Sequence, residues 1–392
     1  MMKGFFNLKQ GVSQSKVELE AVDELYAAIY QEDIQLAVFF CSVDYDLPTL
    51  EIALREKFAG IKLIGCTTAG ELTAEGMLEG TLSGFSINSD QFIADHDVFD
   101  METIESEASA EKLFNLQQRV GTQAGDDFQP LSWVLINSID SKVERVLGVV
   151  DRRFNSMPVV GGSPGGGDYF APTYVYANGC FQANSAIVSY IATSLPFEIF
   201  KIDDFDELPR RVVLTEVDTA RRIVTEIDGL PAVEGYFEAF GVPAKQGTLG
   251  ADFYASHPLA AKVAGDLYVR AIVPPVGHKG GVESDGLQFF CAIEEGMVLS
   301  TVKTKGSLAN FKDKFSRLQA TNGQANLVLA CDCIYRKFDY RMQDVTAEIT
   351  NVMIDNNVQG FHGYGEQLGV MSVNQTFTGV YFGTKDGADE RA

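Results

Sequence analysis

The sequence has few of the residues that mark the common catalytic, metal-binding and secreted designs. It contains one tryptophan, four histidines and six cysteines in 392 residues. The cysteines are spread widely, and most lie in apolar runs, where a reduced thiol behaves as a small hydrophobic group. This spread excludes a disulfide scaffold. Cys331 and Cys333 share a strand face, but no further cysteine or histidine pair completes a zinc site with them.

Basic residues and long apolar runs are also scarce. Lys and Arg number 31 against 54 Asp and Glu, which gives a net charge of −23. Nucleic acids and anionic membranes both need positive charge on a protein partner, so neither is expected to bind. No apolar run reaches the length of a membrane span, and the first residues lack the apolar core of a signal peptide. We therefore expect a soluble, cytoplasmic protein.

The residues that are present indicate an ordinary globular chain of some size. The apolar fraction is 46% and the charged fraction 22%, both near the globular average. A chain of 392 residues is long for a single core, so we predict two domains. We place their boundary between residues 220 and 221, giving domains 1–220 and 221–392.

One pattern recurs along the chain: an apolar strand, a helix, a second strand, a glycine turn and a further strand. It begins near Leu36, Trp133 and Leu327. The same number of residues separates Cys41 from Gly65 in the first copy and Asn137 from Gly161 in the second. Continuous apolar strands alternating with helices predict an α/β (mixed α+β) fold, with two domains of mixed sheets covered by helices. Independent convergence on this arrangement is the alternative to a true repeat.

Residues 360–367 (GFHGYGEQ) form the most unusual segment. We expect a ligand-facing turn there rather than a regular strand or helix, with His362, Tyr364 and Glu366 as candidate ligand-binding residues. His362 stands in an aromatic, glycine-relieved turn, and it is the best candidate to bind a metal or a haem iron through a neutral imidazole. His257 is the second choice. The alternative for His362 is a histidine held by hydrogen bonds within the turn.

Two further positions are candidates for chemistry. Arg336 follows a strand, at the edge where α/β folds bind ligands. Its guanidinium can pair with a ligand carboxylate or a haem propionate. The alternative is a structural ion pair with Glu348 or Glu366. Ser163 lies in a G-x-S-x-G match, but no helix is predicted after it, so a serine hydrolase is not favoured. The sequence has no HExxH motif or closely spaced carboxylate pair. We predict that the chain is not an enzyme.

Several segments together resemble the FIST-domain family. They are residues 63–71 (LIGCTTAGE), 161–163 (GGS), 226–232 (EIDGLPA), 257–259 (HPL), 330–336 (ACDCIYR), 360–367 and 374–376 (NQT). The resemblance implies an N-type domain over 1–220, a C-type domain over 221–392 and a sensory role in signal transduction. It adds further residues to the candidate ligand site, which then consists of Cys66, Thr67, Ser163, Arg336, His362, Tyr364, Glu366 and Asn374.

Within this family, the chain is similar to the stand-alone haem-binding nitric-oxide sensors called NosP. That similarity implies haem as cofactor and a histidine kinase or cyclic-di-GMP enzyme as partner, and it leaves a homodimer open. Two departures bear on the cofactor: Pro164 follows the Gly-Gly-Ser motif, and Ser372 stands where relatives often have a histidine. The chain then either uses another histidine, such as His362, or binds no haem. The alternative is an amino-acid sensor in which Arg336 and Glu366 bind the carboxylate and ammonium groups.

Overall fold

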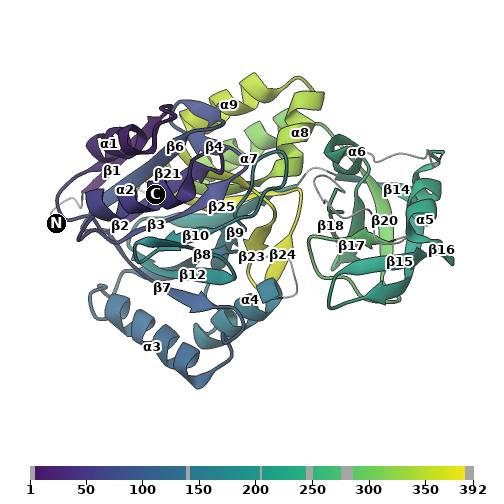
Figure 1. The fold of residues 1–392 in the computed structure, drawn as a ribbon, viewed down its shortest axis with the longest axis horizontal. Helices are drawn as coiled ribbons and strands as arrows, with labels where there is room; N and C mark the ends of the chain where they lie inside the picture. The colour runs from purple at the N-terminus through teal and green to yellow at the C-terminus, as the bar shows by residue number, and fades with distance from the viewer. Residues whose placement is uncertain (1–4, 138–141, 204, 244–249, 275–285, 385–392) are drawn as a thin grey trace, which may run out of the picture.

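The computed structural model describes residues 5–137, 142–203, 205–243, 250–274 and 286–384. The described chain forms a body of three repeated units and a smaller inserted module, residues 205–304, which lies at the right in Figure 1 beside α8, β23 and β24 of the body. This architecture confirms the predicted mixed α+β class.

The elements of the body follow one order in each unit. Unit 1 contains β1 (Phe6–Ser13), α1 (Glu18–Ile29), β2 (Leu36–Ser42), α2 (Leu47–Lys57), β3 (Leu63–Thr68), β4 (Glu71–Thr73), β5 (Gly76–Leu78) and β6 (Leu82–Ser89). Unit 2 contains β7 (Phe92–Asp100), α3 (Glu107–Gly121), β8 (Gln129–Ile136), α4 (Lys142–Arg153), β9 (Val159–Gly162), β10 (Val175–Ala177), β11 (Cys180–Gln182) and β12 (Ser185–Thr193). Unit 3 contains β13 (Phe197–Ile202), α7 (Ser307–Asn322), β21 (Ala325–Cys333), α8 (Ile334–Met342), α9 (Thr346–Asp355), β22 (Val358–Gly363), β23 (Glu366–Leu368), β24 (Met371–Val373) and β25 (Phe377–Gly383).

The three sheets of the body have the same strand order, and each one borrows a hairpin from another unit. The orders are β1-β6-β2-β3-β10-β11, β7-β12-β8-β9-β23-β24 and β13-β25-β21-β22-β4-β5. The hairpin of unit 1 therefore extends the sheet of unit 3, that of unit 2 extends unit 1, and that of unit 3 extends unit 2. The predicted repeat is confirmed, and the exchange of hairpins links its three copies in a cycle.

Each sheet is buried on both faces, which explains the continuous apolar strands in the sequence. The inner faces of the three sheets share one core, to which the units contribute Phe40, Trp133 and Cys331 among others. The outer face of each sheet packs against its own helices in a separate cluster.

Local signals set the helix ends; for example, Asp46 accepts a hydrogen bond from the Thr49 amide and Pro48 follows at the first turn of α2.

The glycine segments begin as strands and turn only after several residues. Gly65, Gly161 and Gly360 lie inside β3, β9 and β22. The expectation that residues 360–367 avoid regular structure is therefore wrong except at Tyr364 and Gly365, because Glu366 and Gln367 lie in β23. A Cβ atom on Gly360 would lie 1.8 Å from the Ala330 carbonyl oxygen, and one on Gly161 would lie 2.0 Å from that of Val134. Glycine is therefore needed because the neighbouring strand approaches closely.

The inserted module forms the fourth sheet. Its elements are β14 (Phe205–Asp218), β15 (Ile223–Ile227), β16 (Leu230–Pro231), α5 (Ala232–Phe240), α6 (Ala251–Ser256), β17 (Leu259–Val263), β18 (Asp266–Arg270), β19 (Leu287–Gln288) and β20 (Val298–Thr304). The strand order is β16-β15-β14-β20-β17-β18, with β19 paired to β15. The module is inserted between β13 and α7 of unit 3, and the predicted boundary at 220/221 falls between β14 and β15.

Candidate functional site

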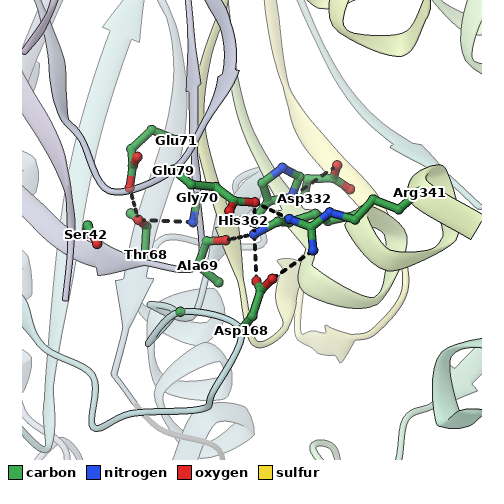
Figure 2. A network of polar contacts seen from close by, with 12 residues as sticks. Ser42, Thr68, Ala69, Gly70, Glu71, Glu79, Asp168, Asp332, Arg341 and His362 are labelled. Carbon is green, nitrogen blue, oxygen red and sulfur yellow. Dashed lines mark hydrogen bonds and ion pairs between the residues drawn. The ribbon is translucent and has the colours of Figure 1, made fainter. Parts of the chain in front are cut away.

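Charged side chains from all three units meet beside the carboxyl ends of β21 and β22. Parallel strands present these ends at one edge of a sheet, and α8 begins directly after β21. This arrangement brings Asp332 and His362 to the edge and places Lys337 and Arg341 four residues apart on α8, on one face of the helix. Figure 2 shows His362, Asp332 and Arg341 close to Glu79 and Asp168, which come from the other two units.

Lys337, Arg341, Glu79 and Asp168 form an ion cluster. Lys337 Nζ lies 2.7 Å from a carboxylate oxygen of both Glu79 and Asp168, and it donates a hydrogen bond of 2.6 Å to the Ala69 carbonyl. Arg341 Nη1 lies 2.8 Å from Asp168, and Nη2 pairs with Glu79. Partial burial raises the pKa of Asp168, but the hydrogen bonds from Lys337 and Arg341 outweigh this and hold it below its usual value.

The cluster is buried at its inner end and open at its outer end. The side chain of Lys337 is 8% exposed, whereas those of Glu79 and Arg341 are 55% and 43% exposed. Interactions at the inner end are therefore strengthened by the low local dielectric, while the outer groups can exchange their partners with water or a ligand.

His362 lies at the inner end and is almost completely buried. Its Nδ1 is 3.5 Å from the Asp332 carboxylate, and neither ring nitrogen has a hydrogen-bond partner in the described part of the chain. Burial, assisted by the positive charges of Lys337, Arg341 and Arg336, lowers the pKa of His362 well below its ordinary value. The imidazole is therefore neutral at neutral pH, with a nitrogen lone pair that no protein donor occupies.

A small cavity is lined by both His362 and residues of the cluster. Its volume is about 170 Å³, and it is lined by Met77, Leu78, Glu79, Lys337, Tyr340, Arg341, Thr346 and His362. Sites for drug-sized ligands are roughly 300–1,000 Å³, so this cavity is suited to a smaller molecule. A neutral imidazole is suitable chemically as an axial ligand, but the space beside it does not fit a haem.

Arg336 belongs to a separate buried group behind this cavity. Its Nε donates to Asp332 Oδ1 at 3.1 Å and to the Tyr340 hydroxyl at 3.0 Å. Burial raises the pKa of Asp332 to about 7, although the nearby Arg336 charge opposes this effect. Arg336 is 3% exposed, so its guanidinium is engaged inside the protein rather than presented to the cavity.

Glu366 and Glu71 are equivalent residues that brace two of the exchanged hairpins. Glu366 accepts hydrogen bonds from the amide and hydroxyl of Thr376, and Glu71 accepts the same pair from Thr81. Burial raises the pKa of Glu366 well above its ordinary value and raises that of Glu71 to about 7. Both carboxyl groups are completely buried, and neither lines the cavity beside His362.

Three predicted site residues occupy one equivalent position in the three units. The amides of Thr67, Ser163 and His362 donate to the residue that precedes each exchanged hairpin, at 3.0, 2.8 and 2.8 Å. Ser163 Oγ accepts from the Gln367 side chain at 3.0 Å, and the chain after it runs to β10 without a helix. Cys66, one residue after Gly65, is fully buried in the shared core. Only the third copy places a titratable ring at this position.

The remaining predicted residues lie at or in the inserted module. Tyr364 stacks on Phe170, and the Asn374 side-chain oxygen accepts from the Ala271 amide of the module at 3.4 Å. His257 follows α6, bonds to its local backbone and stacks on Phe253 with ring centroids 4.1 Å apart. The predicted site residues therefore divide among the cavity, the shared core, the hairpins and the module contact. No three His, Cys, Asp or Glu side chains gather as a metal site within the described ranges.

Sequence reasoning missed Lys337, Arg341, Glu79 and Asp168. The available signal was the pair of basic residues one helical turn apart after Arg336, together with an acid directly after the glycine run 165–167. Neither signal identifies a partner, because the cluster joins residues far apart in the chain.

Comparison with known families identifies a sensory class of protein. The model described as the FIST N domain matches residues 35–230, and that described as the FIST C domain matches residues 232–368. These are sensor domains of signal transduction. The two matches cover most of the chain, which therefore belongs to the FIST family.

A comparison with curated proteins finds no match. Within the described residues, no helix is both long and apolar enough to cross a membrane.

Proposed function

We propose that the chain is a sensor for a small zwitterionic or anionic metabolite, of about the size of an amino acid, bound beside His362. The observation that carries this proposal is the ion cluster: two cations and two carboxylates from three units meet over a cavity of about 170 Å³. A ligand carboxylate can take the place of Asp168 or Glu79 on the cations, and a ligand ammonium can pair with the carboxylate that is released.

Each side chain has a chemical task in this scheme. Arg341 presents a planar fork that suits a carboxylate, and Lys337 supplies a compact charge at the buried end. The neutral His362 ring can donate or accept a hydrogen bond. The cavity also has the side chains of Met77 and Leu78 in its lining, which favours a ligand with a short apolar part. We assign the ligand contacts to Arg341 and Glu79 instead of Arg336 and Glu366, because the latter two are buried and do not line the cavity.

Thermal denaturation against single amino acids and small dicarboxylates tests the proposal. A ligand that binds only the folded chain at 100 times its Kd adds about 2.7 kcal/mol, a rise of a few degrees in Tm. Arg341→Gln should abolish the rise. Arg317→Gln, on an exposed part of α7, is the matched control and should keep it. A panel without any stabilising compound, or an Arg341→Gln variant that responds like the native chain, would contradict the proposal.

Haem-based nitric-oxide sensing is the second candidate. It is favoured by the buried, neutral His362 ring, whose nitrogens form no hydrogen bond within the described residues. Because the cavity does not fit a porphyrin, this function requires the ion cluster to open. Absorption spectra after haem reconstitution test it: a Soret band that changes in His362→Ala but not in His257→Ala supports the assignment, and the absence of a band excludes it.

We further propose that occupancy is read by a separate signalling protein, a histidine kinase or a cyclic-di-GMP enzyme. The support for this step is the sensory class of the family. The measurement is the activity of a purified candidate partner with the ligand-free and ligand-bound chain. Equal activity in the two states would remove that partner from consideration.

A further inference from the structure

Three consecutive side chains after the glycine run 165–167 contact three different parts of the molecule. Asp168 belongs to the ion cluster with Lys337 and Arg341. The Tyr169 hydroxyl donates to the Asp44 carboxylate of unit 1 at 2.8 Å. Phe170 packs against the core of the inserted module. The segment 167–170 is therefore a short physical connection between the proposed ligand site and the module.

The contact of Phe170 with the module is an aromatic stack. Its ring centroid lies 4.9 Å from that of Tyr364 and 6.2 Å from that of Phe290, with interplanar angles of 22° and 27°. Tyr364 belongs to the body and Phe290 to the module, so Phe170 bridges the two. The Tyr364 hydroxyl also donates to the Gly167 carbonyl at 2.9 Å, which fixes the start of the segment.

The backbone of the segment is held in an unfavourable conformation. Phe170 has φ +56°, in the left-handed region that a bulky side chain rarely adopts. Such a conformation persists only where surrounding contacts enforce it. Here those contacts include the Asp168 ion pairs on one side, the aromatic stack on the other, and the hydrogen bond of 2.8 Å from the Ala171 amide to the Gly166 carbonyl. Loss of either anchor therefore favours a change in the other.

Polar contacts also hold the module at other places in the described residues. The buried Arg222 of the module pairs with Glu144 of α4, and the Tyr335 hydroxyl donates to the Ile272 carbonyl at 2.5 Å. Val269 and Asn374 form an isolated bridge between β18 and the segment after β24. The body also packs directly into the module, because Ile334, Tyr335 and Phe338 of α8 belong to the hydrophobic core of the module and α8 contacts α6. The aromatic stack is thus one of several contacts that hold the module in place.

We propose that residues 167–170 relay ligand occupancy to the inserted module. A ligand that competes for Lys337 and Arg341 releases Asp168, the backbone at Phe170 relaxes from its left-handed conformation, and the ring leaves its stack on Phe290. The module then loses one of its anchors on the body. The ligand in this relay rests on the proposed function, but the coupling between Asp168 and the module does not.

The test measures the position of the module by distance between two spin labels. Val263 on β17 and Ile52 on α2 are each 47% exposed and are changed to cysteine as label sites. The background is Cys180→Ser, because the other native cysteines are buried. Asp168→Asn mimics release from the cations and Phe170→Ala removes the stack, and both should broaden or shift the distance distribution without ligand. Tyr169→Phe, which loses only its bond to Asp44, should match the native chain.

The relay is overturned if both Asp168→Asn and Phe170→Ala give the native distribution, or if Tyr169→Phe shifts it equally. Adding the amino acid or dicarboxylate that raises Tm should shift the native chain, while Phe170→Ala binds that compound without a further shift. If no compound of the panel binds but Asp168→Asn still moves the module, the proposed ligand fails and the relay stands. If a compound binds and the distance is unchanged, the relay fails and the ligand stands.

Discussion

Glu71 illustrates how a buried carboxyl group makes folding depend on pH. Burial raises the pKa of Glu71 to about 7, so the folded state holds its proton at a pH where the unfolded state has lost it. Below the unfolded pKa near 4.5, the carboxyl group does not lower the free energy of unfolding. The destabilisation that it causes grows as the pH rises towards 7. Asp332 acts in the same direction, and His362, with its lowered pKa, destabilises the fold in acid.

Glu71→Gln should therefore reduce the loss of stability between pH 5 and pH 8. The expected gain relative to the native chain is up to about 3 kcal/mol at pH 8 and smaller at pH 5. Urea unfolding at several pH values measures it. Glu75→Gln, at an exposed position in the same hairpin, should leave the pH profile unchanged. A Glu71→Gln profile parallel to that of the native chain would show that the buried carboxyl is not the cause.

At this scale, the sequence predicted single unusual residues better than their partners. His362 was identified because a histidine among glycines and aromatic residues is locally unusual, and the structure places it beside the cavity. Lys337 was not identified, because its significance depends on Glu79 and Asp168, and no spacing in the sequence relates them. Arg336 was expected to face a ligand, but Asp332, four residues before it at the end of β21, binds it internally.

Among the structural elements, the central strands depend most strongly on their glycines. Gly360→Ala would place a methyl group 1.8 Å from the Ala330 carbonyl oxygen, and the nearest atoms are all backbone of the paired strand, which cannot move aside as a flexible side chain can. We expect a loss of more than about 3 kcal/mol, or no soluble protein. Gly121→Ala, at the end of α3 with no atom within 4 Å of the added Cβ, should be neutral or stabilising by up to about 1 kcal/mol.

The midpoint of urea unfolding measures both glycine variants. Equal behaviour of Gly360→Ala and Gly121→Ala would contradict the steric account. This requirement could not be read from the sequence, because a glycine in a turn and a glycine under a neighbouring strand look the same until the strand pairing is known. The helix and strand periods, by contrast, are local properties, and they predicted the order of elements in the repeated unit.

For the molecule as a whole, the exchange of hairpins makes the three units depend on one another. The FIST N match, residues 35–230, contains β4 and β5, but these strands extend the sheet formed by β21, β22 and β25. β23 and β24 in turn complete the sheet of unit 2. The FIST N and FIST C regions are therefore interlocked in space. The repeated strand and helix pattern of the sequence does not show which unit each hairpin joins.

A fragment of residues 5–193, which contains units 1 and 2 entire, should not fold independently. Its shared core would lose the contributions of β21, β22 and β25, and the β4–β5 hairpin would have no sheet to join. We expect weak far-UV circular dichroism and strong binding of a hydrophobic dye, as for an incompletely packed chain. Cooperative urea unfolding of this fragment, with native-like circular dichroism, would show that the exchange is not essential.

The equivalent position shared by Thr67, Ser163 and His362 has a consequence for how the protein can change. The three backbone bonds at this position are the same, whereas the segments that follow differ: they are short in units 1 and 3 and long in unit 2, where residues 163–174 carry Asp168 and Phe170. All three units therefore keep the same backbone arrangement at this position. They differ in the side chain of unit 3, which is His362, and in the connecting segment of unit 2. New ligand preferences can arise there by local substitution, because the strands that hold the fold together keep every one of their bonds.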